Sequence, residues 1–256
     1  MRIFVVDAFT GRPFSGNPAA VCLFQEPLAD TDRLRRIAAE LNLPATAFVH
    51  DSHLRWFSPT TELELCGHGT LSTVHVLGEI GNPGPYAFQT LGGVLTAERD
   101  ATGEIALDFP AVPAQPIDIA PELTKALGVT PVAAARSGMD TLAELPSARA
   151  VRDLTPDFAA VLALGGRGLI VTAPADDGTA DFVSRFFAPS RGTNEDSVTG
   201  SAHCTLGPYW AEKLGRTALR GHQVSARGGR VGVETRGDRV RLTGRVVTVL
   251  RGDLAV

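Results

Sequence analysis

Two short stretches of small residues hold the side chains of this chain that are best placed to do chemistry. The first reads Cys-Gly-His-Gly-Thr at residues 66–70, and the second reads Thr-Gly-Ser-Ala-His at residues 199–203. Each follows an acidic turn, at residues 62–64 and 195–196, and each leads into an apolar run typical of a helix. Because a helix N-terminus presents free N–H groups and a partial positive charge, each stretch is a candidate anion site. Two such sites predict two half-domains that close on one small anionic molecule.

His68 is the strongest candidate for acid–base chemistry. It stands between Gly67 and Gly69 at a predicted helix start. The positive end of the helix lowers the pKa of an imidazolium, so a neutral histidine that donates or accepts a proton near neutral pH is expected. The alternative is a histidine that only caps the turn. We interpret Gly67, His68, Gly69, Gly200 and Ser201 as an anion cradle, with Asp196 beside it.

Asp196, Ser201 and Cys66 are the other candidates for the site. Asp196 stands three residues before Thr199, so it either caps the second helix or orients a substrate. Ser201 matches His68 by position in the repeat, and its hydroxyl is suited to binding a carboxylate. The Cys66 thiol is a base if the helix lowers its pKa, although a buried cysteine is more often inert. Thr199 occupies the corresponding place in the second stretch, so a facing pair of thiols is not expected.

Other residues give no sign of a metal or a cofactor. His75 is expected on the buried helix and His222 in a loop, with no metal-ligand spacing between them, and no pair of cysteines forms a CxxC motif. The Gly-Gly-Arg-Gly stretch at residues 165–168 lacks the strand–GxGxxG–helix context of a nucleotide site. These residues therefore give no support for a metal site and only weak support for a nucleotide site.

Bulk composition excludes several classes of partner. The 256 residues are 44% hydrophobic and 20% charged, with a formal net charge of −4 and no basic stripe, so nucleic acid is not expected as a partner. Apolar runs are far shorter than the roughly 20 residues of a membrane span, and the first residues resemble a strand rather than a signal peptide. Three cysteines, an odd number, favour free thiols and a cytoplasmic protein with no membrane partner.

The elements that must position these residues repeat in order along the two halves of the chain. In the first half, alternation predicts strands and helical spacing predicts helices. The strands are expected at residues 2–8, 19–24, 46–50, 54–58, 87–90, 94–98 and 105–109. The helices are expected from a cap within residues 30–32 to about residue 41, and at 71–77. In the second half, helices are expected at 121–127, 155–164 and 206–214, and strands at 132–136, 141–145, 168–173, 181–188, 224–226, 230–235, 239–243 and 245–250.

Each half therefore places strands on both sides of a central helix that a glycine-rich turn introduces. Residues 71–77 carry almost no charge, which is typical of a helix buried on all sides by a curled sheet. A proline-rich crossover at residues 110–121 separates the halves. We expect an α+β protein with an N-terminal lobe at 1–113 and a C-terminal lobe at 114–256, the C-terminal strand being a candidate to return to the first lobe.

Motifs along nearly the whole chain carry a family resemblance. They stand at residues 7–10, 13–21, 42–43, 46–49, 55–60, 65–68, 107–110, 185–189, 195–196 and 198–204. Together they resemble the phenazine-biosynthesis PhzF family, which shares its fold with diaminopimelate epimerase. The resemblance implies two pseudo-symmetric lobes, each a curled mixed sheet or barrel wrapped round a central helix, with the active site between them, and a homodimer. It also implies cofactor-independent isomerisation by proton transfer on a small carboxylated substrate.

One departure from the family pattern bears on the chemistry. The family reads Asn-x-Ser-Glu-Thr-Ala-Phe, and its glutamate is the general acid and base that moves the proton. This chain reads Asn-Leu-Pro-Ala-Thr-Ala-Phe at residues 42–48, so Ala45 stands where the glutamate is expected. General acid–base catalysis commonly contributes ~10²–10⁴-fold to a rate, so its loss threatens the reaction without disturbing the fold. A lesser change is Ser197, where proline is usual.

Three interpretations follow from this departure. The chain is an isomerase in which His68, Asp196 or Cys66 carries the proton. Alternatively, it is a binding or accessory protein that keeps the cleft and has lost the chemistry. The third is a thiol racemase, against which Thr199 in place of a second thiol argues.

Overall fold

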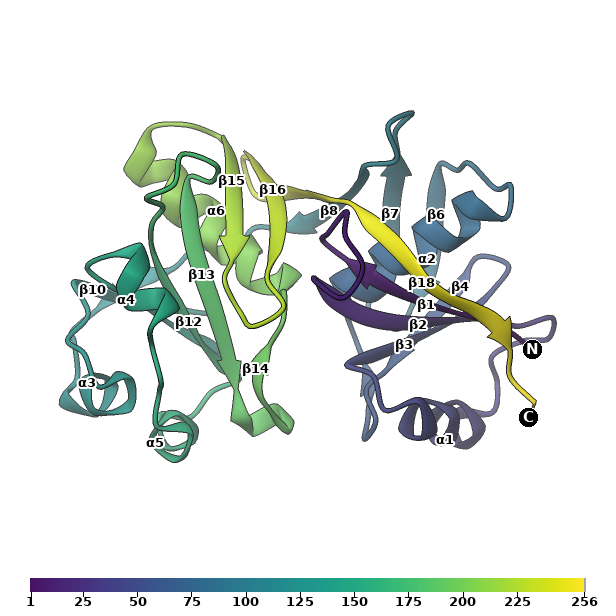
Figure 1. Cartoon of the computed structure of the whole chain (residues 1–256), viewed down its shortest axis with the longest axis horizontal. Coiled ribbons are helices and arrows are strands. Elements are labelled where there is room, and N and C mark those ends of the chain that lie inside the picture. The colour runs from purple at the N-terminus through teal and green to yellow at the C-terminus, as the bar shows by residue number, and fades with distance from the viewer. Residues whose placement is uncertain (256) are drawn as a thin grey trace. The chain divides into compact units, whose positions relative to one another are not determined.

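The chain forms two compact units, shown in Figure 1 for a computed structural model that describes residues 1–255. The first unit comprises Met1–Asp108 and the C-terminal segment that begins at Thr243. The second unit comprises Phe109–Leu242. Among the described residues, no helix is long and apolar enough to cross a membrane.

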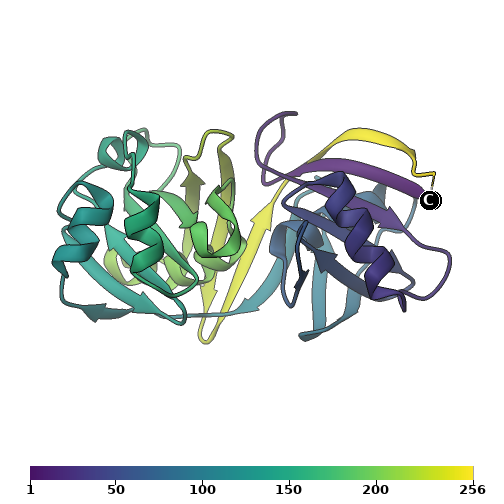
Figure 2. The same cartoon turned by 90° about the horizontal axis from the view of Figure 1, so that it is seen from below.

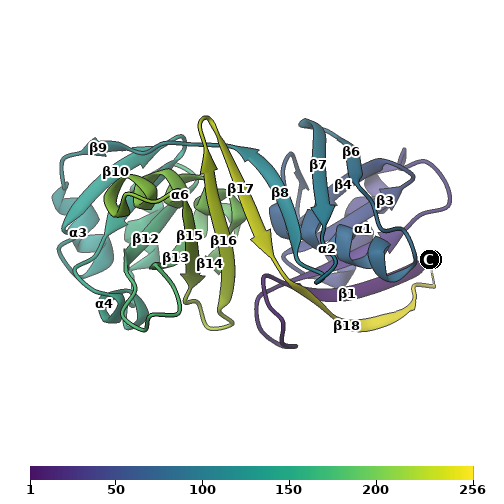
Figure 3. The same ribbon diagram turned by 90° about the horizontal axis from the view of Figure 1, so that it is seen from above.

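The last strand of the chain belongs to the first unit. Strand β18 (Val246–Asp253) pairs antiparallel with β1 (Arg2–Ala8), so the yellow C-terminal strand runs beside the purple N-terminal one in Figure 3. The lobes expected from the sequence were 1–113 and 114–256. The observed boundary falls five residues earlier than expected, after Asp108, and the pairing with β1 carries the final segment across to the first unit.

The first unit is a mixed sheet with two helices. Its remaining elements are β2 (Asn17–Leu23), α1 (Thr31–Leu41), β3 (Ala45–His50), β4 (His53–Phe57), β5 (Glu62–Leu63), α2 (Gly67–Glu79), β6 (Tyr86–Thr90), β7 (Gly93–Arg99) and β8 (Ile105–Pro110). Strand β1 pairs with β2, which runs parallel to β3, and β3 is antiparallel to β4. Strand β4 pairs antiparallel with β5 through Trp56 and Phe57, and parallel with β6 through His53. Strands β6, β7 and β8 form an antiparallel meander.

Helix α1 has the limits that its sequence predicts. The Asp30 side chain accepts a hydrogen bond from the Arg33 backbone N–H at 2.9 Å and so caps the helix. Asn42 ends it in the left-handed conformation with φ of 49°. The apolar face, with Leu34 and Ile37, is buried against the sheet of this unit, which the helix crosses in Figure 2.

Helix α2 is buried along most of its length, as the uncharged sequence predicts. Residues 69–76 are all buried, and the helix packs against β1, β2, β3, β7 and β18. The hydroxyls of Thr70, Ser72 and Thr73 donate to the carbonyl oxygens four residues earlier, at 2.7–2.9 Å. These bonds satisfy polar side chains that have no access to water.

The second unit repeats this construction around helix α6. Its elements are β9 (Gln115–Ile117), α3 (Pro121–Leu127), β10 (Ala133–Ser137), β11 (Asp140–Glu144), α4 (Ala148–Arg152), α5 (Phe158–Ala163), β12 (Gly168–Pro174), β13 (Phe182–Ala188), a 3-10 turn η1 (Pro189–Arg191), β14 (Thr193–Asp196), α6 (Gly200–Leu214), β15 (Ala218–Gln223), β16 (Gly229–Arg236) and β17 (Arg239–Gly244). The strands pair in the order β9, β10, β11, β12, β13, and β13 continues to β14 and β15.

Three expectations for the second half are wrong. The strand expected at 224–226 is absent, and β15 lies just before it. Strand β15 was not predicted because only Leu219 of its three buried positions is apolar, the others being Gly221 and Gln223. His222 therefore lies in a strand and not in a loop. The helix expected at 155–164 is the shorter α5, which Asp157 caps by accepting from two backbone N–H groups, and the five-residue α4 before it was not predicted.

Pro208 lies inside α6 without breaking the hydrogen bonding around it. Proline has no N–H, so the Cys204 carbonyl four residues earlier lacks its helical donor. The backbone N–H of Val112 donates to that carbonyl at 3.1 Å instead. Ser137 bonds both the Val112 oxygen and the Thr205 hydroxyl, so the crossover segment is fastened to the helix.

Candidate functional site

An arginine–glutamate pair holds the strand that leads into α2. Arg55 on β4 donates from Nε and Nη2 to the two carboxylate oxygens of Glu62 on β5, both at 2.7 Å. Its Nη1 donates to the Leu28 backbone oxygen at 2.6 Å, and its guanidinium carbon lies 5.2 Å from the ring centre of Phe57. The pair therefore fixes β5, and with it the approach to α2, against the neighbouring strand.

The same arrangement recurs before α6. Arg185 on β13 donates from Nε and Nη2 to Glu195 on β14 at 2.7 and 2.9 Å, and from Nη1 to the Leu154 backbone oxygen at 2.6 Å. The guanidinium carbon lies 4.9 Å from the ring centre of Phe187. The sequence predicted acidic turns here, whereas the two glutamates lie in short strands and are ion-paired. Each lies opposite a phenylalanine of the adjacent antiparallel strand and bonds the arginine two residues before that phenylalanine. A sequence signal for these ion pairs exists, because an arginine stands two residues before a phenylalanine in both halves, at residues 55–57 and 185–187.

At the start of α2, a thiol and an imidazole are in contact. The Cys66 sulfur lies 3.6 Å from Nδ1 and 3.9 Å from Nε2 of His68. Cys66 is buried and His68 is half-buried. Gly69 is required for this packing, because a Cβ there would lie 2.9 Å from the Cys66 sulfur and 2.7 Å from Cδ1 of Trp56. Two groups that can each exchange a proton therefore lie together at the helix N-terminus.

At the start of α6, Asp196 is linked to the helix through Thr199. The Thr199 hydroxyl donates to the Asp196 carboxylate at 2.6 Å. The buried amide of Gln223 accepts from the Thr199 backbone N–H at 2.8 Å and donates to the Asp196 backbone oxygen at 2.8 Å. Asp196 is half-buried at the end of β14. Gln223 is a residue that the sequence did not single out, because its place in β15 was not predicted.

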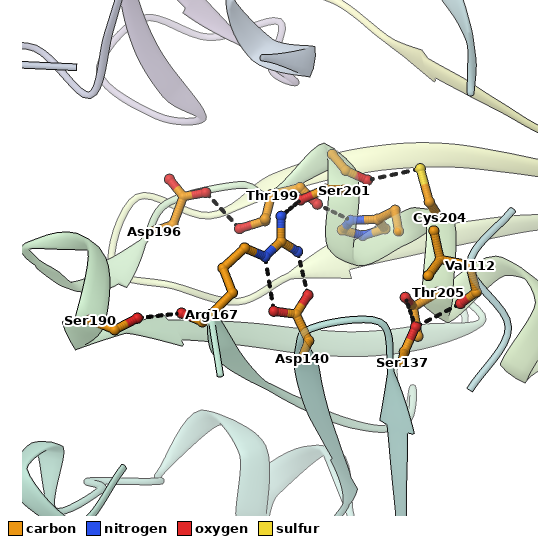
Figure 4. A network of polar contacts seen from close by, with 12 residues as sticks. Val112, Ser137, Asp140, Arg167, Ser190, Asp196, Thr199, Ser201, Cys204 and Thr205 are labelled. Carbon is orange, nitrogen blue, oxygen red and sulfur yellow. Dashed lines mark hydrogen bonds and ion pairs between the residues drawn. The ribbon is translucent and has the colours of Figure 1, made fainter. Parts of the chain in front are cut away.

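Arg167 is a second residue that sequence reasoning missed. Its Nη1 donates to the Ser201 hydroxyl oxygen at 2.9 Å, and its Nε donates to Asp140 at 2.9 Å, with a further bond from Nη2 to the same carboxylate (Figure 4). Burial by itself lowers the pKa of Arg167, but the hydrogen bonds and charge of Asp140 outweigh burial and raise it, so the guanidinium stays charged. The sequence considered residues 165–168 only as a weak nucleotide motif.

The histidine that ends the second stretch is a core residue. His203 is fully buried, and its Nδ1 donates to the Thr199 carbonyl at 2.8 Å. Burial lowers its pKa to about 4, so the ring is neutral. His203 therefore differs from His68, which is partly accessible.

The candidate residues fall into two groups, one in each unit. Gly67, His68, Gly69 and Cys66 lie at the start of α2, and Asp196, Gly200 and Ser201 lie at the start of α6. That both groups bind the same molecule stays a prediction. No cluster of three or more metal-ligating side chains occurs among residues 1–255.

Comparison with known proteins identifies the family. The model of the phenazine biosynthesis-like protein family, PhzC-PhzF, matches residues 6–252. The chain belongs to this family. A relative named as an uncharacterized isomerase, from Halalkalibacterium halodurans, is 44% identical over 98% of this chain and 97% of its own length.

Solved structures place the PhzF-like chain in the diaminopimelate epimerase-like fold. A PhzF family protein from Enterococcus faecalis has a TM-score of 0.94 and 38% identity, over 100% of this chain and 99% of the other. A hydroxyproline epimerase from Agrobacterium vitis has a TM-score of 0.63 and 12% identity, over 98% and 91% of the two chains, and shares the fold alone. The α+β fold expected from the sequence is confirmed, and the PhzF-like relatives named isomerases support isomerase chemistry at the level of the family.

Ala45 has no acid–base group to offer in this PhzF-like chain. It begins β3, opposite Ala19 of β2, and its side chain is fully buried. Cys22, in the same sheet, is buried, and burial raises the pKa of its thiol to about 12. Of the three cysteines, Cys66 is the one in contact with an imidazole at a candidate site.

Proposed function

We propose that this PhzF-like chain is an isomerase that moves a proton on a small carboxylated metabolite without a cofactor. We propose further that Ala45 occupies the position of the family's catalytic glutamate and that other residues supply the acid–base group. The family assignment and the relatives named isomerases support the reaction class. A cytoplasmic homodimer of about 54 kDa, twice the 26.9 kDa chain, is part of the same proposal.

The contact between Cys66 and His68 carries the proposal. A separation of 3.6 Å between Sγ and Nδ1 lets the two groups share one proton. The helix N-terminus favours thiolate over thiol and neutral imidazole over imidazolium, so it favours the basic form of each group. His68 is the partly exposed member and is assigned as the proton carrier, with Cys66 as its partner.

Recognition of the substrate's carboxylate is assigned to the two helix starts. The first helical hydrogen bond of α2 runs from the Thr70 N–H to the Cys66 oxygen, so the N–H groups of residues 67–69 precede the helical ladder. Gly67, Gly69 and Gly200 let a ligand approach the backbone, and Ser201 adds a hydroxyl. Asp196, oriented by Thr199, is the second candidate to hold a proton.

The test is deuterium incorporation from D₂O into carbon. The protein is incubated with a panel of amino acids and cyclic carboxylates, and each compound is followed by NMR. We expect uptake by the wild type, slower but measurable uptake by Cys66→Ala, which removes only the partner of His68, and no uptake by His68→Ala. The matched control is His53→Ala, an exposed histidine on β4 of the same unit, which should exchange like the wild type. Uptake that persists in His68→Ala and disappears in Asp196→Asn reassigns the proton carrier to Asp196.

A binding or accessory protein is the second candidate, and the fully buried, non-titrating Ala45 favours it. In that case a compound that measurably binds the wild type shows no uptake of deuterium. Uptake that appears only in Ala45→Glu would show that the acid–base group alone was missing. The thiol-racemase alternative is disfavoured because Thr199 begins α6 where Cys66 begins α2.

A further inference from the structure

Arg167 is fixed in place on all sides. Its backbone N–H donates to the Met139 oxygen at 2.8 Å, and its own carbonyl accepts from the Ser190 hydroxyl at 2.8 Å. Gly166 makes the turn before it with φ of +80°, and a Cβ there would lie 2.4 Å from the Met139 oxygen. The guanidinium is held by Asp140, whose side chain is 4% exposed, and lies 5.4 Å from the ring centre of Phe186. The fold therefore delivers a rigid guanidinium to the start of α6.

The hydrogen bond from Arg167 determines which way the Ser201 hydroxyl is oriented. A guanidinium can only donate, so Ser201 accepts through an oxygen lone pair and its own proton points elsewhere. On α2, three hydroxyls donate to the carbonyls four residues earlier. The corresponding carbonyl for Ser201, that of Ser197, accepts from the Ser225 hydroxyl at 2.7 Å. Within residues 1–255, the structure shows no acceptor for the Ser201 proton.

The ion pair between Arg167 and Asp140 orients the neighbouring hydroxyl and carries no net charge. Asp140 neutralises Arg167, so the pair adds little to the field at the start of α6. Three of the five guanidinium N–H groups have acceptors, two on Asp140 and one on Ser201. Such a partly buried pair costs desolvation free energy, which an apolar pair would avoid. Its use is in orienting the hydroxyl beside it.

We propose that Arg167 is a positioning residue that, anchored on Asp140, makes Ser201 a hydrogen-bond donor to the carboxylate of the substrate. This rests on the proposed function in that it assigns the start of α6 to a carboxylate. The new element is that Arg167 affects carboxylate binding only by orienting the Ser201 hydroxyl. A lysine at 167 keeps the charge but has a single nitrogen, which cannot span Asp140 and Ser201 as the planar fork does.

The experiment measures binding rather than turnover. The ¹⁵N-labelled protein is titrated with benzoate, and with benzamide as the uncharged control, while the backbone amides of Gly200 and Ser201 are followed by NMR. We expect benzoate to shift both amides and benzamide to leave them unchanged. Ser201→Ala and Arg167→Lys should each weaken benzoate binding about tenfold, the usual effect of one hydrogen bond to a charged group. The double variant should be no weaker than Ser201→Ala alone.

Each result bears on the proposal separately from catalysis. If the tenfold losses of benzoate affinity multiply in the double variant, Arg167 acts independently of Ser201 and the proposal is overturned. Unchanged benzoate binding by Arg167→Lys would overturn it as well. Benzoate that shifts neither amide would overturn the carboxylate site itself. Arg149→Lys, an exposed arginine of the same unit, is the control and should bind as the wild type does. If deuterium exchange fails but the binding results hold, the proposed reaction is wrong and the positioning role of Arg167 stands.

Discussion

Replacement of Arg185 by methionine should destabilise the chain strongly, although the side chain is not in the apolar core. Arg185 and Glu195 have side chains only 13% and 20% exposed. The substitution removes two charge-assisted bonds to Glu195 and the bonds from Nη1 to backbone carbonyls, of which those to Leu154 and Val151 measure 2.6 and 3.2 Å, and it leaves the carboxylate without its partner. Breaking a buried pair costs ~3–5 kcal/mol. Because this pair is partly exposed, we expect about 3 kcal/mol in the free energy of unfolding.

Calorimetry measures this effect as a change in Tm. For a protein of this size, 1 kcal/mol corresponds to roughly 2–4 °C, so Arg185→Met should lower Tm by about 6–12 °C. The control is Arg149→Met, because Arg149 pairs with Asp153 at 86% and 67% exposure, and such surface pairs contribute less than about 1 kcal/mol. Arg55→Met, which breaks the equivalent pair with Glu62, should behave like Arg185→Met.

A double variant separates the ion pair from simple packing. Arg185→Met with Glu195→Leu removes both charges, so no carboxylate is left without its partner, and part of the lost stability should return. The Leu154 carbonyl still loses its donor, so recovery should be incomplete. A Tm for Arg185→Met within 2 °C of the Arg149→Met control, on the same roughly 2–4 °C scale, would refute this reasoning.

Three further predictions concern buried groups. Burial raises the pKa of Cys22 to about 12, so iodoacetamide at pH 8 should leave Cys22 unmodified in the folded protein and alkylate it in urea; modification without denaturant would contradict this. Burial lowers the pKa of His203 from 6.5 to about 4, so the unfolded chain binds the proton first, and the free energy of unfolding should fall by roughly 3 kcal/mol between pH 6.5 and 4. Urea titrations should show a smaller slope in His203→Gln than in the wild type, because burial also lowers the pKa values of His75 and His222 and their contribution remains. Gly69→Ala should lower Tm although alanine favours helices, because its Cβ would meet the rigid ring of Trp56, whereas Gly78→Ala in the same helix meets only the movable side chain of Arg99 and should not lower it.

Local patterns in the sequence were sufficient for much of the fold. The capping residues before α1, Asp30 among them, and its apolar spacing predicted the limits of this helix, because capping and periodicity act over a few residues. The uncharged run in α2 gave its burial correctly for the same reason. The family motifs then gave the arrangement of the strands, which local patterns cannot specify.

Long-range contacts were out of reach of the same reasoning. Arg167 meets Asp140 and Ser201 across 27 and 34 residues of sequence, and no periodicity connects them. Strand β15 was missed because its buried positions include glycine and glutamine, and with it the Gln223 amide that fastens Thr199. The candidate residues themselves were found from glycine-rich turns before helices, but their partners emerged only from the tertiary structure.

The exchange of a substrate C–H with D₂O, compared between the wild type and His68→Gln, tests the central claim most directly. The glutamine keeps the size and polarity of the side chain but cannot carry the proton. The account predicts deuterium at carbon for the wild type with at least one carboxylated compound, and a rate lowered at least about 100-fold in the variant. Equal rates in the two proteins would contradict a reaction centred on His68.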